Sequence, residues 1–551
     1  MKKSIYLGLP SIVLLQSFTV FPEYFVSISI IYVLIALVLI TYNVYGLILQ
    51  KALSECIALI LLMTCYLIVN DDLISLDFFS FHNSIVNDSL SSITKILICF
   101  FSALYFLLIS NSLKEQKLTS FEYVLIILFS ILGLMLMCGS NDLLTAYLAI
   151  ELSSLSLYIL ASFKKTSSYS IESGLKYFIT GAVSSAFFLL GSSFLYVYSG
   201  SICFDDFPCI LSKTIPQPTG NLLTYYGSYY TKSLIYAFTH PNDSIALLCF
   251  TPEPEYASLF EPFDYSFVEI GFSLILFSLF IKLACAPFHF WSLDVYEGSP
   301  TTSSFFFAAI TKLSIFVLLI RFFYISLFSL NDSCQFYCFW VGILSVFVGS
   351  FGGLKQRKLK TLIAYSSITN MGYGVIALGT TTNVGIQMLF FHLVIYMISG
   401  LCTWSILLFL RLKTKRATNK YNKELCDLAL LRKSNPALAF ALALTMFSIA
   451  GIPPMIGFLA KMGVFLSVIS SHFILFAVAS AVFSVIATFY YIRIIKVLYF
   501  ENLLVGKLYY PINSEKTIIL SFLIFSLLML FFNPSIIYLF SYKIISKYLI
   551  I

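Results

Sequence analysis

The sequence predicts an all-α polytopic membrane protein with about 14 transmembrane helices. Of its 551 residues, 59% are hydrophobic and only 11% are charged, whereas a soluble domain is nearer a quarter charged. The hydrophobic residues fall into separate runs of about 20 residues, each long enough to cross the hydrocarbon core of a bilayer. Because these runs are continuously apolar rather than alternating, we expect helices and not barrel strands.

The predicted spans are spread along most of the chain. They are expected at 23–48, 51–70, 92–112, 121–139, 141–163, 174–198, 267–291, 302–328, 336–353, 359–380, 384–410, 435–470, 472–498 and 516–541. The twelfth span is overlong and is interrupted by the sequence GIPP at 451–454.

The charged loops predict an orientation. Outside the spans, most Lys and Arg lie in loops that follow odd-numbered spans, and the largest group lies between Arg411 and Lys433. The longest loop on the opposite side, 199–266, is acidic. By the positive-inside rule the odd loops face the cytoplasm or matrix, and both termini face the other way. We expect the 199–266 loop to form a partly ordered lid on the outer face.

Four ionisable residues are expected deep inside spans: Glu151, Lys282, Lys312 and Lys461. Each costs roughly 2.5–3.5 kcal/mol at the centre of a membrane helix. One explanation is snorkelling of the long side chains to the headgroups, but Lys282 and Lys312 are expected roughly 14 Å deep at 1.5 Å per residue. A second explanation, a buried structural ion pair with Glu151, leaves the other lysines unpaired.

A functional interpretation uses the same physics. Burial penalises the charged form of an amine, whereas a nearby carboxylate favours it. A buried lysine can therefore gain or lose a proton when its neighbour moves, which arginine cannot do. Three lysines and one glutamate form a hypothetical proton relay.

Helix breaks accompany two of these lysines. Pro287 follows Lys282 by five residues, and the break at Gly451, Pro453 and Pro454 precedes Lys461. Proline removes an intrahelical hydrogen bond, and free carbonyls survive at membrane depth only inside protein or beside water. The two broken spans, the seventh and twelfth, cross the membrane in opposite directions, which is typical of an inverted-repeat transporter.

The same segments resemble a known family. KLACAPFHFWSLDVYEGSPT, KLKTLIAYSSITNMGYGVIALG and SIAGIPPMIGFLAKMGVF resemble the antiporter-like subunits of proton-pumping NADH:quinone oxidoreductase, respiratory complex I. AYLAIELSSLSLYIL and ESGLKYFITGAVSSAFFLLG are most similar to its subunit 2, or N, branch. The resemblance covers roughly 120–500 and implies two inverted five-helix repeats, made of spans four to eight and nine to thirteen.

The resemblance also implies roles for residues. Glu151 matches the family's fifth-helix glutamate, Lys282 the seventh-helix lysine that pairs with it, Lys312 the central eighth-helix lysine and Lys461 the twelfth-helix lysine. Three further polar residues are accessory candidates: His289, Asn370 and His392. Asn370 departs from the pattern, because many members have histidine or glutamine there.

Four segments follow from this division: 1–120 with spans one to three, 121–330 with the first repeat, 331–500 with the second, and 501–551 with the last helix. No CxxC pair, HExxH or phosphate-binding glycine loop occurs, so no cofactor or metal is expected in this chain. The resemblance implies that NADH, FMN, iron–sulfur clusters and ubiquinone are bound by partner subunits. Expected partners are other complex I membrane-arm subunits, including neighbouring antiporter-like subunits, and lipids, with no nucleic acid.

The expected location is the mitochondrial inner membrane, with both termini toward the intermembrane space, or alternatively a bacterial plasma membrane. Two other functions stay open at this point. The first is a subunit of a multisubunit cation/proton antiporter, which shares these motifs. The second is a proton-silent structural spacer of the membrane arm, although a spacer does not explain why buried charges are kept at such a cost.

Overall fold

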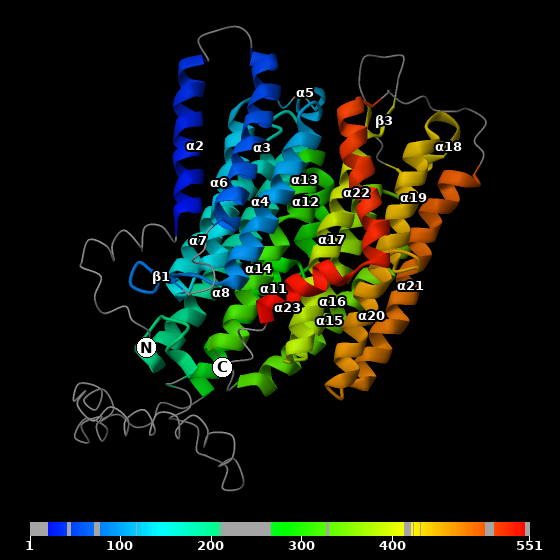
Figure 1. Ribbon diagram of the computed structural model, residues 1–551. Helices are drawn as coiled ribbons and strands as arrows, with labels where there is room; N and C mark the ends of the chain where they lie inside the picture. The colour runs from blue at the N-terminus through cyan, green and yellow to red at the C-terminus, as the bar shows by residue number, and fades with distance from the viewer. Residues whose placement is uncertain are drawn as a thin grey trace, which may run out of the picture.

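The computed structural model describes residues 20–40, 46–70, 78–116, 118, 120–208, 210, 266–326, 330–412, 420, 421, 424–429, 431–501 and 512–545. These residues form a bundle of long helices that run side by side along one direction (Figure 1). Eleven of the described helices are long and apolar enough to cross a membrane. The prediction of an all-α polytopic membrane protein is confirmed.

Each predicted span overlaps one helix or consecutive shorter helices, but the end of the first span was wrong: it was predicted at residue 48, whereas the next helix already begins at Gly46. The N-terminal group is α2 (Phe21–Ile40), α3 (Gly46–Val69) and α4 (Ser89–Ile109). The next five spans contain α6 (Glu122–Gly139), α7 (Leu143–Ser162), α8 (Ser168–Ser199), α11 (Ser266–Leu283) with α12 (Phe290–Gly298), and α13 (Thr301–Ala309) with α14 (Thr311–Ile320) and the π-helix η2 (Arg321–Ser326). The remaining spans contain α15 (Asn331–Leu354), α16 (Leu359–Gly379), α17 (Asn383–Phe409), α19 (Pro436–Ala450) with α20 (Ile456–Ser470), α21 (Ile474–Tyr499) and α22 (Ser514–Phe532).

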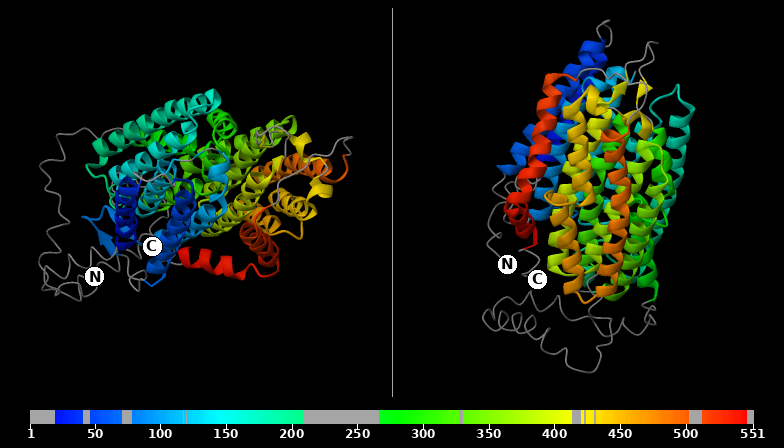
Figure 2. Two further views of the ribbon diagram at one scale, coloured as in Figure 1. Left: turned by 90° about the horizontal axis from the view of Figure 1, so that it is seen from above. Right: turned by 90° about the vertical axis from the view of Figure 1, so that its right-hand side faces the viewer.

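The end of the fourteenth span was predicted wrongly. The prediction placed it at residue 541, but α22 ends at Phe532 and a separate helix, α23 (Ser535–Ile545), follows. Pro534 lies between them and cannot continue the helix, because it has no backbone donor. Because the sequence is apolar on both sides of this break, its composition did not reveal where the helix ends. Helix α23 lies across the side of the bundle, against α17 and α4 (Figure 2).

Short elements connect the long helices. Strands β1 (Phe78–Ser80) and β2 (Ile85–Asn87) pair antiparallel before α4, and β3 (Arg411–Leu412) and β4 (Lys420–Tyr421) pair after α17. Three one-turn helices complete the described connections: α5 (Ser112–Glu115), η4 (Leu425–Leu428) and α18 (Leu431–Ser434).

Most of the 199–266 loop, expected to form a lid, lies outside the described residues. Its described beginning folds back onto the bundle. Phe204 and Phe207 are each 1% exposed, and the side-chain amide of Asn141 donates to Asp205 Oδ2 at 2.9 Å.

Small residues allow the closest helix pairs to form. A Cβ atom on Gly191 of α8 would lie 2.6 Å from the carbonyl oxygen of Gly271 in α11. A Cβ atom on Gly372 of α16 would lie 2.2 Å from the hydroxyl of Ser345 in α15. Membrane helices gain most of their association energy from such close packing, since lipid tails are as apolar as their side chains.

The two predicted repeats lie next to each other (Figure 2, left). Two contacts tie the start of α16 to the end of α12. Lys358 forms an ion pair with Glu297, and Lys360 Nζ donates to the Ser299 carbonyl at 2.7 Å. At this point the two repeats are therefore joined through polar groups at the ends of α12 and α16.

Candidate functional site

Lys282 lies where the seventh span breaks into two half-helices. It belongs to the last turn of α11, which ends at Leu283, and α12 begins only at Phe290. Pro287 lies between them. The last carbonyls of α11 have no intrahelical partner, and the negative end of a helix dipole stabilises a nearby cation. The break therefore gives the Lys282 ammonium a favourable place inside the bundle.

Trp291 closes this break from the side of α12. Its indole Nε1–H donates to the Ile281 carbonyl at 2.9 Å, one residue before Lys282. The indole ring also stacks on Tyr177 of α8, with centroids 4.7 Å apart and planes inclined by 9°. The Ile281 carbonyl also accepts from the Ala284 backbone N–H at 3.1 Å, so the indole adds a second hydrogen bond there and fixes the end of α11 against α8.

Lys461 reaches a similar environment by a different route. It lies in α20, after the second break, and its Nζ donates back to the carbonyl of Ala450 at 2.9 Å. Ala450 is the last residue of α19, so this ammonium also lies at the C-terminal end of a half-helix. Gly451 caps α19 with φ +81°, a conformation that favours glycine. A Cβ atom there would also lie 2.9 Å from Lys461 Cδ.

Lys312 lies in the first turn of α14, just after a distortion at Ile310 that separates α13 from α14. It is 5% exposed. Its ammonium is 5.4 Å from the ring centroid of Tyr396 in α17 and 5.9 Å from that of Tyr296 in α12. The distance to the Tyr396 hydroxyl is 3.4 Å, at the long end of a hydrogen bond. Lys312 and Lys461 both end inside the protein, so neither snorkels.

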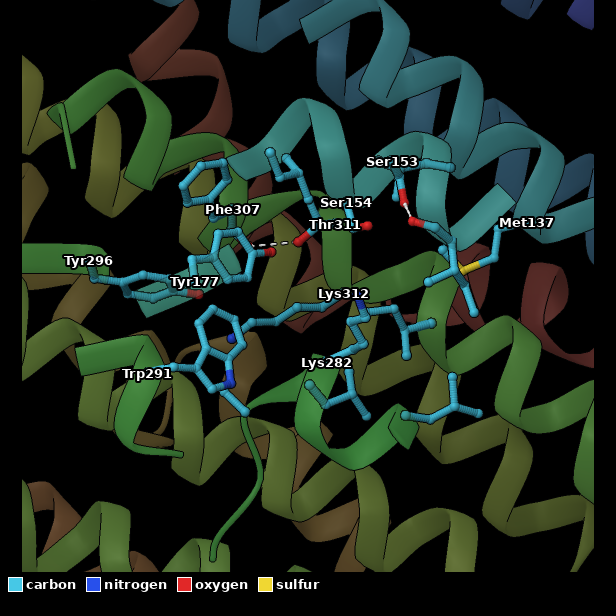
Figure 3. A pocket seen from close by; sticks show the side chains of 17 residues that line it. Met137, Ser153, Ser154, Tyr177, Lys282, Trp291, Tyr296, Phe307, Thr311 and Lys312 are labelled. Carbon is cyan, nitrogen blue, oxygen red and sulfur yellow. Dashed lines mark hydrogen bonds between the residues drawn. The ribbon is translucent and has the colours of Figure 1, made fainter. Parts of the chain in front are cut away.

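Lys282 and Lys312 share one cavity (Figure 3). The cavity has about 30 Å³ of space for the centres of water molecules. A cavity needs only about 10–15 Å³ on this measure to hold one water. Ser153 and Ser154 of α7 and Thr311 also line it. The cavity is therefore large enough to hold water beside the two lysines.

Glu151 does not form an ion pair with Lys282 in this structure. It is half-buried, and its Oε2 lies 3.4 Å from the Ser154 hydroxyl. Its Oε1 is buried with no hydrogen-bond partner. Lys282 Nζ instead donates to the hydroxyl of Tyr158, also on α7, at 3.1 Å. The family-implied glutamate and lysine are thus on neighbouring helices but in separate contacts.

Glu151 also lies beside the outward-facing side of α7. Leu148 and Leu155, one turn before and after it, are 57% and 51% exposed. The Glu151 side chain therefore lies near a face of α7 that the described residues of this chain leave uncovered.

The second repeat holds a separate polar group around Lys461. Its ammonium lies 5.4 Å from the Tyr373 ring centroid, and that ring lies edge-on to His392 with centroids 6.1 Å apart. His392 Nε2 is 3.1 Å from the backbone carbonyl of Asn370. The Asn370 side chain donates to Ser366 of its own helix. Lys461 does not line the cavity that Lys282 and Lys312 share.

His289, the third accessory candidate, lies at the start of α12. It is 6% exposed, and its Nδ1 is buried without a hydrogen-bond partner. Its ring contacts Phe290, with centroids 4.3 Å apart. It lies in the same break as Pro287, but it does not line the shared cavity.

Two buried ion pairs escaped the sequence prediction of buried charges. Lys95 of α4 pairs with Glu23 of α2 at 2.5 Å, with side chains 2% and 4% exposed. Arg321, the first residue of η2, pairs with Asp88 at 2.7 Å and is 1% exposed. We call these two contacts the N-terminal ion pairs. The first pair joins α2 to α4, and the second joins the start of α4 to η2 in the first repeat. Both add buried charges beyond the four that were predicted.

The tyrosines next to the three lysines were also missed. The sequence contains 36 tyrosines, and their positions alone do not distinguish Tyr158, Tyr373 or Tyr396 from the rest. The one signal available was the seven-residue spacing of Glu151 and Tyr158, which places both on one face of a helix.

The chain matches a known family over more than half of its length. The family described as NADH:quinone oxidoreductase/Mrp antiporter, TM, matches residues 140–241 and 244–487. This match defines the class of protein as an antiporter-like membrane subunit.

Curated relatives narrow the class. NADH-quinone oxidoreductase subunit N of Pelagibacter ubique is 35% identical over 88% of this chain and 89% of its own length. NADH-ubiquinone oxidoreductase chain 2 of Marchantia polymorpha is 35% identical over 73% of this chain and 72% of its own. The chain therefore belongs to the subunit N, or chain 2, family of NADH:quinone oxidoreductase, as its motifs predicted.

Solved structures agree with the fold. A chain of respiratory complex I from Thermus thermophilus superposes with a TM-score of 0.68 at 23% identity, covering 94% of this chain and 98% of that one. A chain of the Mrp complex from Dietzia superposes with a TM-score of 0.72 at 14% identity, covering 97% of each. The same helical architecture is thus present in both complexes.

Proposed function

We propose that this chain is the membrane-arm subunit of respiratory complex I that carries protons through Lys282, Lys312 and Lys461, driven by quinone reduction in other subunits. The observation that carries this proposal is the shared cavity. Two lysines from different helices line it, and among the described residues no carboxylate oxygen lies within 4.0 Å of either ammonium. Amines without a fixed counter-charge can change protonation state at lower cost than paired ones.

In the proposed sequence, an electrostatic change in a neighbouring subunit acts first on Glu151. When Lys282 leaves its position near Glu151, it passes a proton through cavity water to Lys312. The change in charge at Lys312 then acts electrostatically across α17, the helix that carries Tyr396. The Lys461 ammonium, which donates to the Ala450 carbonyl, then releases its proton toward the outer face. This chain performs no redox chemistry itself.

The proposed setting follows from the family. NADH, FMN, iron–sulfur clusters and ubiquinone bind to partner subunits, and the direct neighbours are other membrane-arm subunits and lipids. The basic loops after odd-numbered spans face the matrix, and both termini face the intermembrane space of mitochondria. A bacterial plasma membrane is the alternative location.

The test uses the assembled complex in proteoliposomes. Lys282→Ala should reduce proton pumping and NADH:quinone turnover together by at least tenfold, since each lysine is a step in one coupled path. Lys165→Ala is the matched control, because Lys165 is an exposed lysine in the loop between α7 and α8. Normal pumping by an assembled Lys282→Ala complex would refute the proposed role.

Two other functions remain distinguishable by experiment. A cation/proton antiporter subunit would exchange cations without any NADH-oxidising partner copurifying. A proton-silent spacer would leave the number of protons pumped per NADH unchanged after Glu151, Lys282, Lys312 and Lys461 are all neutralised. The named relatives that are at least 30% identical over two thirds of this chain favour complex I.

A further inference from the structure

In this structure the Lys282 ammonium contacts a phenol, and not the carboxylate with which the proposed mechanism pairs it. The only hydrogen bond described for the Lys282 ammonium runs to the Tyr158 hydroxyl, at 3.1 Å. The same ammonium lies 5.6 Å from the centroid of the Tyr158 ring. Tyr158 is 7% exposed, so this contact is made inside the protein, where a hydrogen bond to a charged group counts for more than in water.

Glu151 and Tyr158 are alternative partners for one lysine. They are seven residues apart on α7, about 10.5 Å along the helix axis at 1.5 Å per residue. Lys282 cannot bond to both from one position. In this structure Glu151 is beside Ser154, and Lys282 lines the cavity that it shares with Lys312.

The site is built around the phenol. A Cβ atom on Gly181 of α8 would lie 1.7 Å from the Tyr158 hydroxyl oxygen, so glycine is needed to make room for it. Tyr177 packs edge-on against the Tyr158 ring, with centroids 4.7 Å apart and planes at 90°. Tyr177 is in turn stacked on Trp291, which holds the end of α11. Ring packing and a cleared space thus fix the hydroxyl beside the break.

We propose that Tyr158 is a positioning residue that holds Lys282 on the cavity side, away from Glu151, and so sets the balance between the two states of the relay. This inference rests on the proposed function and adds a residue to it. Without the hydroxyl, Lys282 loses the only hydrogen-bond partner described for its ammonium, and the Glu151 carboxylate becomes its best remaining partner. The lysine then spends most of its time where it cannot pass a proton to Lys312.

Tyr158→Phe tests the proposal in assembled complex reconstituted into proteoliposomes. It keeps the ring packing and removes only the hydroxyl. Coupled NADH:quinone turnover should fall about tenfold, the change that ~1.4 kcal/mol produces, with the protons pumped per NADH unchanged. The matched control is Tyr147→Phe, which removes a phenol hydroxyl from the same helix and should keep normal turnover. Tyr147 stacks loosely on Phe188, with centroids 6.3 Å apart, and has no described contact with a lysine.

A purely structural role would not couple Tyr158 to Glu151, so a double-mutant cycle provides the second readout. Glu151→Gln should cost clearly less turnover in the Tyr158→Phe background than alone, because the competing carboxylate is then already harmful. Independent, multiplying effects would overturn the proposal. Gly181→Ala should reproduce the Tyr158→Phe defect by displacing the hydroxyl, and should add little to it in combination.

The outcomes separate this inference from the proposed function. If Lys282→Ala pumps normally, the proposed function fails. If Lys282→Ala is inactive while Tyr158→Phe behaves like Tyr147→Phe, only the positioning role fails. The amount of assembled complex is measured independently in every case, by NADH oxidation with a soluble electron acceptor.

Discussion

The N-terminal ion pairs and two of the proposed relay lysines, Lys312 and Lys461, are buried to a similar degree but offset the cost of burial differently. Lys95 and Arg321 each have a carboxylate within 2.7 Å. Lys312 and Lys461 are 5% and 7% exposed, yet their described contacts are with tyrosines and a backbone carbonyl. A fixed counter-charge locks a buried cation in place, whereas dipoles and aromatic rings stabilise it more weakly.

The difference separates charges that hold the structure together from charges that can be switched. A paired lysine or arginine keeps its proton, and removing its partner leaves an uncompensated charge. A lysine held only by dipoles can alternate between two protonation states. Each prediction below tests this division, from the largest expected effect to the smallest.

The largest loss of stability is expected for Asp88→Asn. Arg321 is buried and cannot become neutral, so weakening its pair should cost about 3–5 kcal/mol. We expect little assembled complex and a strongly lowered midpoint of heat inactivation. Lys165→Ala, on the surface, serves as the control. Near-normal heat stability would mean that the pair of Arg321 and Asp88 does not hold the structure together.

Lys95→Met should destabilise the protein less. It leaves Glu23 buried, but a carboxylic acid can take up a proton and so avoid most of the charge penalty. Adding Glu23→Gln should recover most of the lost heat stability, since the pair is then replaced by neutral groups. The double variant should pump normally. Failure of pumping in a stable double variant would assign this pair to the proton path.

Lys312→Met should have the opposite stability effect. Replacing an uncompensated buried amine with an apolar side chain of similar length removes a desolvation cost. The midpoint of heat inactivation should be unchanged or higher, while coupled turnover falls at least tenfold. A drop in stability as large as that of Asp88→Asn would show that Lys312 is a structural charge.

Trp291→Phe should have the smallest effect. The ring stack on Tyr177 is largely kept, but the hydrogen bond to the Ile281 carbonyl is lost, which costs about 0.5–1.5 kcal/mol. Turnover should fall only a few-fold, and heat stability should fall slightly. Turnover equal to that of the unmodified complex would mean that the bond from the Ala284 N–H to this carbonyl is enough to keep the break in place.

The helices and the central lysines could be predicted from the sequence because both depend on local composition. An apolar run of sufficient length defines a span, and a lysine inside such a run stands out. Lys95 and Arg321 obey the same rule, but they lie nearer the ends of the predicted third and eighth spans, where a long side chain can reach water. Their burial depends on how helices pack, which composition does not reveal.

The contact between Lys282 and Tyr158 could not be predicted for a related reason. The two residues are 124 positions apart, and tyrosine is common throughout the chain. The bend between α22 and α23 was also lost, because Asn533 and Pro534 are only two residues within a continuous apolar composition. For Lys282 and Tyr158 the sequence lacks the distance between segments that are remote along the chain, whereas the bend is a local break that composition alone does not mark.

The glycine contact between α8 and α11 limits how the first repeat can move. At Gly191 and Gly271 the two backbones touch with no side chain between them. Because no side-chain atoms separate the two helices at this point, α11 cannot tilt or shift without moving α8 with it. Because residue 282 lies within α11 and before the break at 284–289, displacement of the Lys282 ammonium must then come from rotation about the side-chain torsions of the lysine itself.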